Sequence, residues 1–171
     1  FCLVPVLVTG GPGSGKTTLA LLKAQRQIAS LEPGQEVLFL SFSRAAVARI
    51  LDAAKLESTK AEQEQLSIQT FHSFFWDILK AHAYLLGAPH RLSILLPHDE
   101  KALSGGLRDE DEGWDEWLVE RERLFREEGR IAFDLFAPNA TALLARSSHL
   151  LASIAHRHPI IIVDEAQDTG Q

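Results

Sequence analysis

The sequence predicts an α/β fold in which a mainly parallel sheet is flanked by helices and interrupted by a mostly helical insertion. Short apolar segments alternate with helical patterns at both ends of the chain, which is typical of parallel strands joined by crossover helices. Between Gly87 and Pro159 this alternation stops and helical patterns follow one another. We therefore expect a sheet domain made of residues 1–89 and 157–171, with residues 90–156 as the insertion.

The expected elements follow from local patterns along the chain. Four apolar segments predict strands at 3–8, 37–41, 66–70 and 160–163. Helical spacing of apolar residues predicts helices at 18–31, 45–56, 71–86, 114–125 and 141–155. Thr59 and Glu62 have the spacing of a capping box, which predicts a short helix before the third strand. The Gly- and acid-rich residues 97–113 indicate a loop, and Trp114 and Trp117 are expected in the core of the insertion.

Composition sets limits on what the chain does. The 171 residues are 46% hydrophobic and carry a net charge of −6, enough apolar material for a sizeable core. Most of the acidity lies in residues 99–128, so the remainder is nearly neutral and a face for a polyanion is permitted. There is one cysteine, Cys2, and no apolar run of membrane-spanning length or leader pattern. We expect a cytoplasmic protein.

Residues 10–17, Gly-Gly-Pro-Gly-Ser-Gly-Lys-Thr, fit the P-loop pattern G-x-x-x-x-G-K-[ST] between a predicted strand and a predicted helix. Glycines let successive backbone N–H groups face one concavity, and the helix adds its positive N-terminal end. Lys16 is expected to reach the β- and γ-phosphates and the Thr17 hydroxyl to ligate Mg²⁺. The expected nucleotide-binding residues are Gly11, Pro12, Gly13, Ser14, Gly15, Lys16, Thr17 and Thr18.

The apolar segment 160–163 ends in two carboxylates, Asp164 and Glu165. Ligands of open α/β sheets lie beyond the carboxyl ends of the strands, so both acids are expected beside the lysine loop. Asp164 would hold Mg²⁺ together with Thr17, and Glu165 would orient and polarise the attacking water. These residues favour hydrolysis of ATP or GTP.

Three further segments carry a resemblance to a known family. Residues 164–169, Asp-Glu-Ala-Gln-Asp-Thr, resemble the D-E-x-Q-D/N-T motif of superfamily 1 helicases. Residues 38–46 resemble their apolar strand with T/S-F-T/S and an Ala-rich helix, and residues 69–74 resemble their T-F-H-G/S element. The chain is thus similar to the first RecA-like domain of UvrD/Rep-type DNA helicases and their AddA/RecB-type relatives. The resemblance is good over 1–86 and 159–171, and covers 90–156 by position only.

The resemblance implies a P-loop NTPase (RecA-like) fold, ATP and Mg²⁺ as cofactors, and single-stranded DNA as a partner in repair or recombination. It assigns DNA contact to Phe42, Ser43, Arg44, Thr70, Phe71, His72 and Ser73, and catalytic roles to Lys16, Glu165 and Gln167, the last coupling hydrolysis to DNA movement. The alternative role of Phe42 and Phe71 is packing in the core. The alternative for His72 is that it is an ordinary histidine with its hydrogen bonds satisfied within the protein.

In the family a second RecA-like domain of the same protein supplies arginines to the γ-phosphate. The sequence ends before such a domain, so we expect this polypeptide alone to be a poor ATPase and not a helicase. The alternative function is a nucleotide-dependent P-loop regulatory or binding module that does not translocate.

Overall fold

The computed structural model describes residues 6–10 and 14–164. The chain divides into two compact units, one formed by Phe1–Thr70 with Ile154–Gln171 and the other by Phe71–Ser153. Each unit has its own sheet. Within the described ranges, no helix has both the length and the apolarity needed to cross a bilayer.

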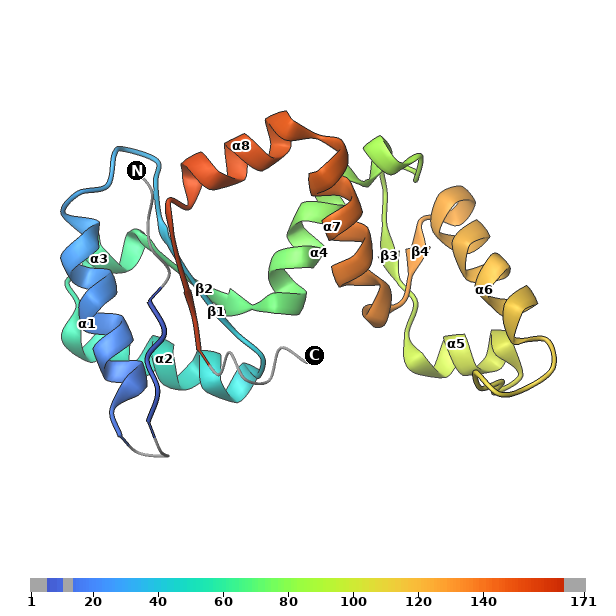
Figure 1. The fold of residues 1–171 in the computed structure, drawn as a ribbon, viewed down its shortest axis with the longest axis horizontal. Helices are drawn as coiled ribbons and strands as arrows, with labels where there is room; N and C mark the ends of the chain where they lie inside the picture. The colour runs from blue at the N-terminus through green and yellow to red at the C-terminus, as the bar shows by residue number, and fades with distance from the viewer. Residues whose placement is uncertain (1–5, 11–13, 165–171) are drawn as a thin grey trace. The chain divides into compact units, whose positions relative to one another are not determined.

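The first unit is built on a three-stranded parallel sheet in the order β2-β1-β5 (Figure 1). These strands span Leu66–Thr70 (β2), Val37–Ser41 (β1) and Ile160–Val163 (β5), which confirms three of the four predicted strands. The central strand β1 is buried along its whole length, as expected for a strand covered on both faces.

Helices α1 (Lys16–Ile28) and α2 (Arg44–Glu57) pack on this sheet. Ala24 and Ile28 of α1 form a buried cluster with Val37 of β1. The register pairs Val37 with Ile160, so these side chains share one face. On β5 the residues that alternate with them, Ile161 and Val163, are 55% and 39% exposed.

A short helix, α3 (Lys60–Glu64), precedes β2 and confirms the predicted capping box. The Thr59 hydroxyl accepts a hydrogen bond from the Glu62 backbone N–H at 3.3 Å, and the Glu62 carboxylate accepts one from the Thr59 N–H at 2.7 Å. The bonds from Thr59 hold the pKa of Glu62 below its ordinary value. Such reciprocal bonds satisfy donors that have no partner within the helix.

The predicted first strand at 3–8 is wrong over residues 6–8, which the structure leaves without strand pairing. Val6, Leu7 and Val8 are 67%, 79% and 47% exposed. The three described strands of the first unit pair with one another and not with this segment, so it lacks the ladder that a strand needs. Residues 3–5 of the predicted strand lie outside the described residues.

The second unit is mostly helical and contains a two-stranded parallel sheet, β3-β4. In Figure 1, α4 and α7 lie side by side, and their packing is close. Its elements are α4 (Phe71–His82), a 3₁₀ turn η1 (Ala83–Leu86), β3 (Ser93–Ile94), α5 (Pro97–Ser104), α6 (Trp114–Arg123), a π-helical turn η2 (Leu124–Glu128), β4 (Arg130–Ile131), a 3₁₀ turn η3 (Phe133–Leu135) and α7 (Phe136–Arg146). Helix α8 (Ser148–Arg157) spans the boundary between the units.

Two expectations for this region are wrong. Residues 97–104 form helix α5 and not a loop, because Pro97 occupies the first turn, two acids follow it and Gly105 ends it with φ 66°. The helix expected at 141–155 is two helices, since Ser147 adopts an extended conformation between α7 and α8. Its hydroxyl then accepts a hydrogen bond from the Leu150 N–H at 3.3 Å in the first turn of α8.

The β3-β4 ladder joins the parts of the second unit. Gly129 adopts φ 67° just before β4, and its carbonyl accepts a hydrogen bond from the Ser93 N–H at 2.7 Å. A cluster of Leu95, Trp117, Leu124 and Ala132 is buried beside the ladder, with Trp114 packed against it. This confirms the expected core role of both tryptophans.

One buried cation connects three elements of this unit. The Arg121 side chain on α6 is 8% exposed. Its guanidinium donates to Asp134 of η3 at 2.7 Å and lies 3.1 Å from a Glu100 oxygen of α5. A buried charge is tolerated only when it is paired and hydrogen-bonded, so these contacts fix the helices to one another.

Candidate functional site

The described part of the glycine-rich loop leads directly into α1. Gly15 is the N-cap of α1 with φ 78°, a left-handed conformation that favours glycine. Among the described residues no side chain caps this helix start, and the first N–H groups of a helix have no partner within it. The Lys16 ammonium donates a hydrogen bond to the Gly10 carbonyl at 2.6 Å, which folds the lysine back over the loop.

Gly10 lies close to the Ser14 side chain. A Cβ built on Gly10 would lie 2.6 Å from the Ser14 hydroxyl oxygen, closer than real contacts allow. A larger residue at position 10 would therefore require the Ser14 side chain to move.

A described hydrogen bond joins the start of α1, directly after the loop, to the residue that follows strand β5. The Thr17 hydroxyl donates to a carboxylate oxygen of Asp164 at 3.4 Å, across 147 residues of sequence. Asp164 is placed by the sheet, because its N–H donates to the Leu40 carbonyl of β1 at 2.9 Å. The predicted pairing of Thr17 with Asp164 is thus present in the folded chain.

These two oxygens suit a magnesium ion. Mg²⁺ takes oxygen ligands in an octahedron at about 2.0–2.1 Å, so two adjacent ligands lie about 3 Å apart. The 3.4 Å separation of the Thr17 and Asp164 oxygens is close to that value. A hydroxyl and a carboxylate are also the hard donors this ion prefers.

The predicted DNA-contact residues of the first unit lie at neighbouring strand ends. Ser41 of β1 is paired in register with Thr70 of β2, and Leu40 with Val163, the residue before Asp164. Adjacent strands are about 4.8 Å apart, so these ends share one edge of the sheet. Thr70 is buried.

The segment that follows β1 turns immediately into α2. Phe42 is half-buried, whereas Ser43 and Arg44 are exposed. The Ser43 hydroxyl accepts a hydrogen bond from the Ala46 N–H at 3.0 Å and so caps α2. This cap leaves the hydroxyl proton of Ser43 able to donate.

The remaining predicted contacts belong to the second unit. His72 and Ser73 are exposed near the start of α4, and Phe71 is half-buried. The His72 ring lies edge-on to Phe133, with centroids 6.4 Å apart. His72 is therefore packed against aromatic residues on one side and accessible on another.

Several predicted site residues lie outside the described residues, and their placement stays a prediction. They are Gly11, Pro12, Gly13, Glu165 and Gln167. Sequence reasoning missed the Gly10 carbonyl as the acceptor for Lys16, because backbone acceptors leave no mark in a sequence. It also missed Ser41, whose buried hydroxyl has no hydrogen-bond partner in the described structure; a serine ending an all-apolar strand was the available signal.

Comparison with known proteins identifies one family. The sequence profile of the UvrD/REP helicase N-terminal domain matches residues 2–122. This match covers the glycine-rich loop, strands β1 and β2, and much of the second unit. A search of curated proteins gives no match.

Proposed function

This chain belongs to the UvrD/REP helicase N-terminal domain family, and we propose that it is the ATP-binding domain of an ATP-dependent helicase that moves along single-stranded DNA. Membership in this family supports the assignment of the chain to a helicase-type enzyme. The observation that carries the ATPase part of the proposal is the contact between Thr17 and Asp164. It brings the end of a P-loop sequence against the acid that follows an apolar strand.

In this proposal the residues of the loop bind the nucleotide. Lys16 leaves the Gly10 carbonyl and donates to the β- and γ-phosphates, while the N–H groups at the start of α1 face the phosphate oxygens. Thr17 and Asp164 would hold Mg²⁺, which neutralises phosphate charge when bound. Glu165 orients the attacking water, and Gln167 couples hydrolysis to movement of the strand.

The DNA part of the proposal rests on the edge where β1 and β2 end. Phe42 offers a half-buried ring, and Arg44 offers an exposed cation in the first turn of α2. Ser43, Thr70, Phe71, His72 and Ser73 supply further sequence-independent contacts. Phosphate contacts position a strand without reading its sequence, which suits an enzyme that travels along DNA in repair or recombination.

The proposal extends to the domain layout. Residues 1–89 and 157–171 act as the RecA-like domain and residues 90–156 as its insertion, and a second RecA-like domain of the same protein completes the catalytic site. Related NTPases gain about 10³–10⁵ in rate from an arginine supplied in this way.

The test is ATP hydrolysis, with and without single-stranded DNA, by the protein joined to its second RecA-like domain. We expect DNA to stimulate the rate, and Lys16→Ala to lower the stimulated rate by about 100-fold or more, the usual loss for a donor to a transition-state charge. Lys23→Ala is the matched control, because Lys23 is exposed on the same helix. It should leave the rate unchanged.

A second measurement separates binding from turnover. Titration with a fluorescent ATP analogue should show weaker binding for Lys16→Ala and not for Lys23→Ala. A hydrolysis rate that DNA does not change would contradict the helicase proposal and favour a nucleotide-dependent regulatory module.

A further inference from the structure

The charges of the second unit are segregated along the chain. No Asp or Glu occurs between Asp77 and Asp99, or between Asp134 and Asp164, in a protein with a net charge of −6. The two acid-free stretches meet in space, because α7 packs along α4 and against the turn η1 (Figure 1). The end of α4, the turn η1 with residues 87–92, and α7 therefore bring together two stretches that contain no carboxylate of their own, and we call this region the acid-free surface.

The cations on this surface are exposed, and the described structure gives them no ion-pair partner. Lys80, Arg91 and Arg146 are exposed. In the described part of the chain, none of the three forms an ion pair. Their charge is available to a ligand.

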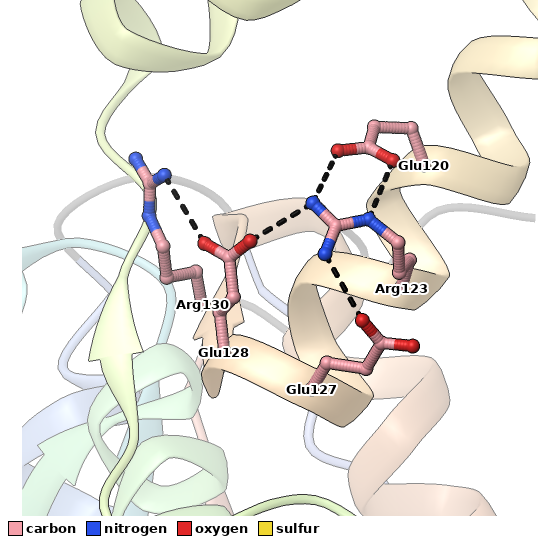
Figure 2. Close-up of polar contacts among 5 residues, drawn as sticks. All are labelled: Glu120, Arg123, Glu127, Glu128 and Arg130. Carbon is pink, nitrogen blue, oxygen red and sulfur yellow. Dashed lines mark hydrogen bonds and ion pairs between the residues drawn. The ribbon is translucent and has the colours of Figure 1, made fainter.

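The cations of α6 and β4 are placed differently, although the Arg91 backbone lies beside Gly129, which follows Glu128. Figure 2 shows the Arg123 guanidinium bound to Glu120 at 2.7 Å, Glu127 at 3.0 Å and Glu128 at 2.8 Å. These bonds raise the pKa of Arg123 and lower that of Glu120. Arg130 also lies 3.8 Å from Glu128. These cations face carboxylates and offer little to a polyanion.

A pair of stacked rings lies on the acid-free surface. The Tyr84 and His90 rings are stacked, with centroids 5.0 Å apart and an interplanar angle of 27°. Tyr84 is 44% exposed and His90 is exposed. Lys80 precedes Tyr84 by four residues, and Arg91 directly follows His90. Each ring therefore has a cation close in sequence and is already held in place before any ligand arrives.

We propose that the acid-free surface is a second contact for single-stranded nucleic acid, at which a base stacks on the Tyr84–His90 pair and Lys80 and Arg91 bind phosphates. Rings that stack on bases and cations that follow the backbone are the two features that sequence-independent strand binding needs. The inference deepens the proposed function, because it adds a site for the same strand on the second unit.

Binding of a labelled oligo(dT) by the whole protein, without nucleotide and across a salt series, tests the inference. Tyr84→Ala should weaken binding about fivefold or more, the loss expected for one stacked base, and Tyr84→Phe should keep the affinity. Lys80→Gln and Arg91→Gln should each reduce the slope of log K against log salt by about 0.7, the value for one phosphate contact on a single strand.

The matched control is Arg123→Gln, which removes one positive charge from the same unit at a site already neutralised. It should leave the salt slope unchanged. An equal loss in Arg123→Gln and Arg91→Gln, or unchanged affinity in Tyr84→Ala, overturns the inference. So does displacement of the oligonucleotide by a poly-glutamate peptide of equal charge, because the surface would then select acidic protein segments. A parallel titration with oligo(U) identifies which strand, DNA or RNA, binds tighter.

Failure of this surface can be told apart from failure of the proposed function. DNA-stimulated ATP hydrolysis together with an oligonucleotide affinity insensitive to Tyr84→Ala refutes the surface alone. An affinity that falls in Tyr84→Ala without DNA-stimulated hydrolysis refutes the proposed function alone.

Discussion

Replacing Gly129 with alanine tests how the second unit is held together. Gly129 has φ 67°, and a Cβ built on it would lie 2.4 Å from the Arg91 carbonyl oxygen, which is backbone and has little freedom to move. The substitution therefore adds two costs, an unfavourable left-handed conformation and a steric clash with a neighbouring chain segment.

The magnitude follows from these two costs. A left-handed residue other than glycine costs about 1–2 kcal/mol. Relief of the clash requires the two segments to separate, which weakens the hydrogen bond from the Ser93 N–H to Gly129 and that from the Leu95 N–H to Ile131, at 2.7 and 2.8 Å. Each is worth about 1 kcal/mol. We expect Gly129→Ala to lower the free energy of unfolding by about 3–4 kcal/mol.

Urea unfolding followed by tryptophan fluorescence measures this loss, since Trp114 and Trp117 lie at the core of the same unit. Gly105→Ala is the matched control, because Gly105 has φ 66° and nothing lies within 4 Å of its added Cβ. It should cost only the conformational part, about 1–2 kcal/mol. Equal losses in the two variants would refute the argument that the close approach to Arg91 matters.

Three further substitutions have defined outcomes. Asp134→Ala should lower the free energy of unfolding by about 2–3 kcal/mol, because it leaves the buried Arg121 short of a partner; adding Arg121→Leu should recover part of the loss, measured by urea unfolding. Thr59→Ala should cost about 1 kcal/mol in the same assay by removing the cap of α3. Burial lowers the pKa of His158 below its ordinary 6.5, so the unfolded chain takes up that proton more readily. The stabilisation from His158 is therefore present above pH 6.5 and is lost as the pH falls below it, a slope that His158→Gln should reduce.

Each of these has an outcome that contradicts it. No recovery in the double variant would mean that the cost of Asp134→Ala does not come from the unpaired Arg121. Unchanged stability in Thr59→Ala would show that water satisfies the helix start equally well. A pH dependence unaltered by His158→Gln would assign the acid sensitivity to another group.

The elements marked by a repeating apolar pattern or a capping motif were predictable from the sequence, whereas the elements that depend on a single contact between distant segments were not. Strands β1, β2 and β5 are apolar runs with clear ends, and the capping box at Thr59 and Glu62 predicts α3. Strands β3 and β4 have two residues each, too few to show alternation, and they form because Gly129 lets the segments approach. The break at Ser147 was missed because the apolar spacing continues through it.

The candidate site also contains residues that the sequence predicts and others that only the fold reveals. The P-loop pattern and the acid after β5 led to Thr17 and Asp164, which the fold brings together. The lack of acids in residues 78–98 and 135–163 is visible in the sequence, but only the packing of α7 on α4 brings the two stretches together. Which residues share a surface depends on packing, which a single sequence does not state.

The π-helical turn Leu124–Glu128 has a consequence for tolerance to length changes. A π turn holds one residue more than an α turn of the same rise, so this segment behaves as an α-helix with a one-residue insertion. Deleting an exposed residue such as Glu127 would remove this extra residue and let the turn close to α geometry, so that Gly129 would keep its place beside Arg91. Deletion of one residue here should therefore disturb the second unit less than deletion of one within α6, where it would rotate the following residues by about 100°.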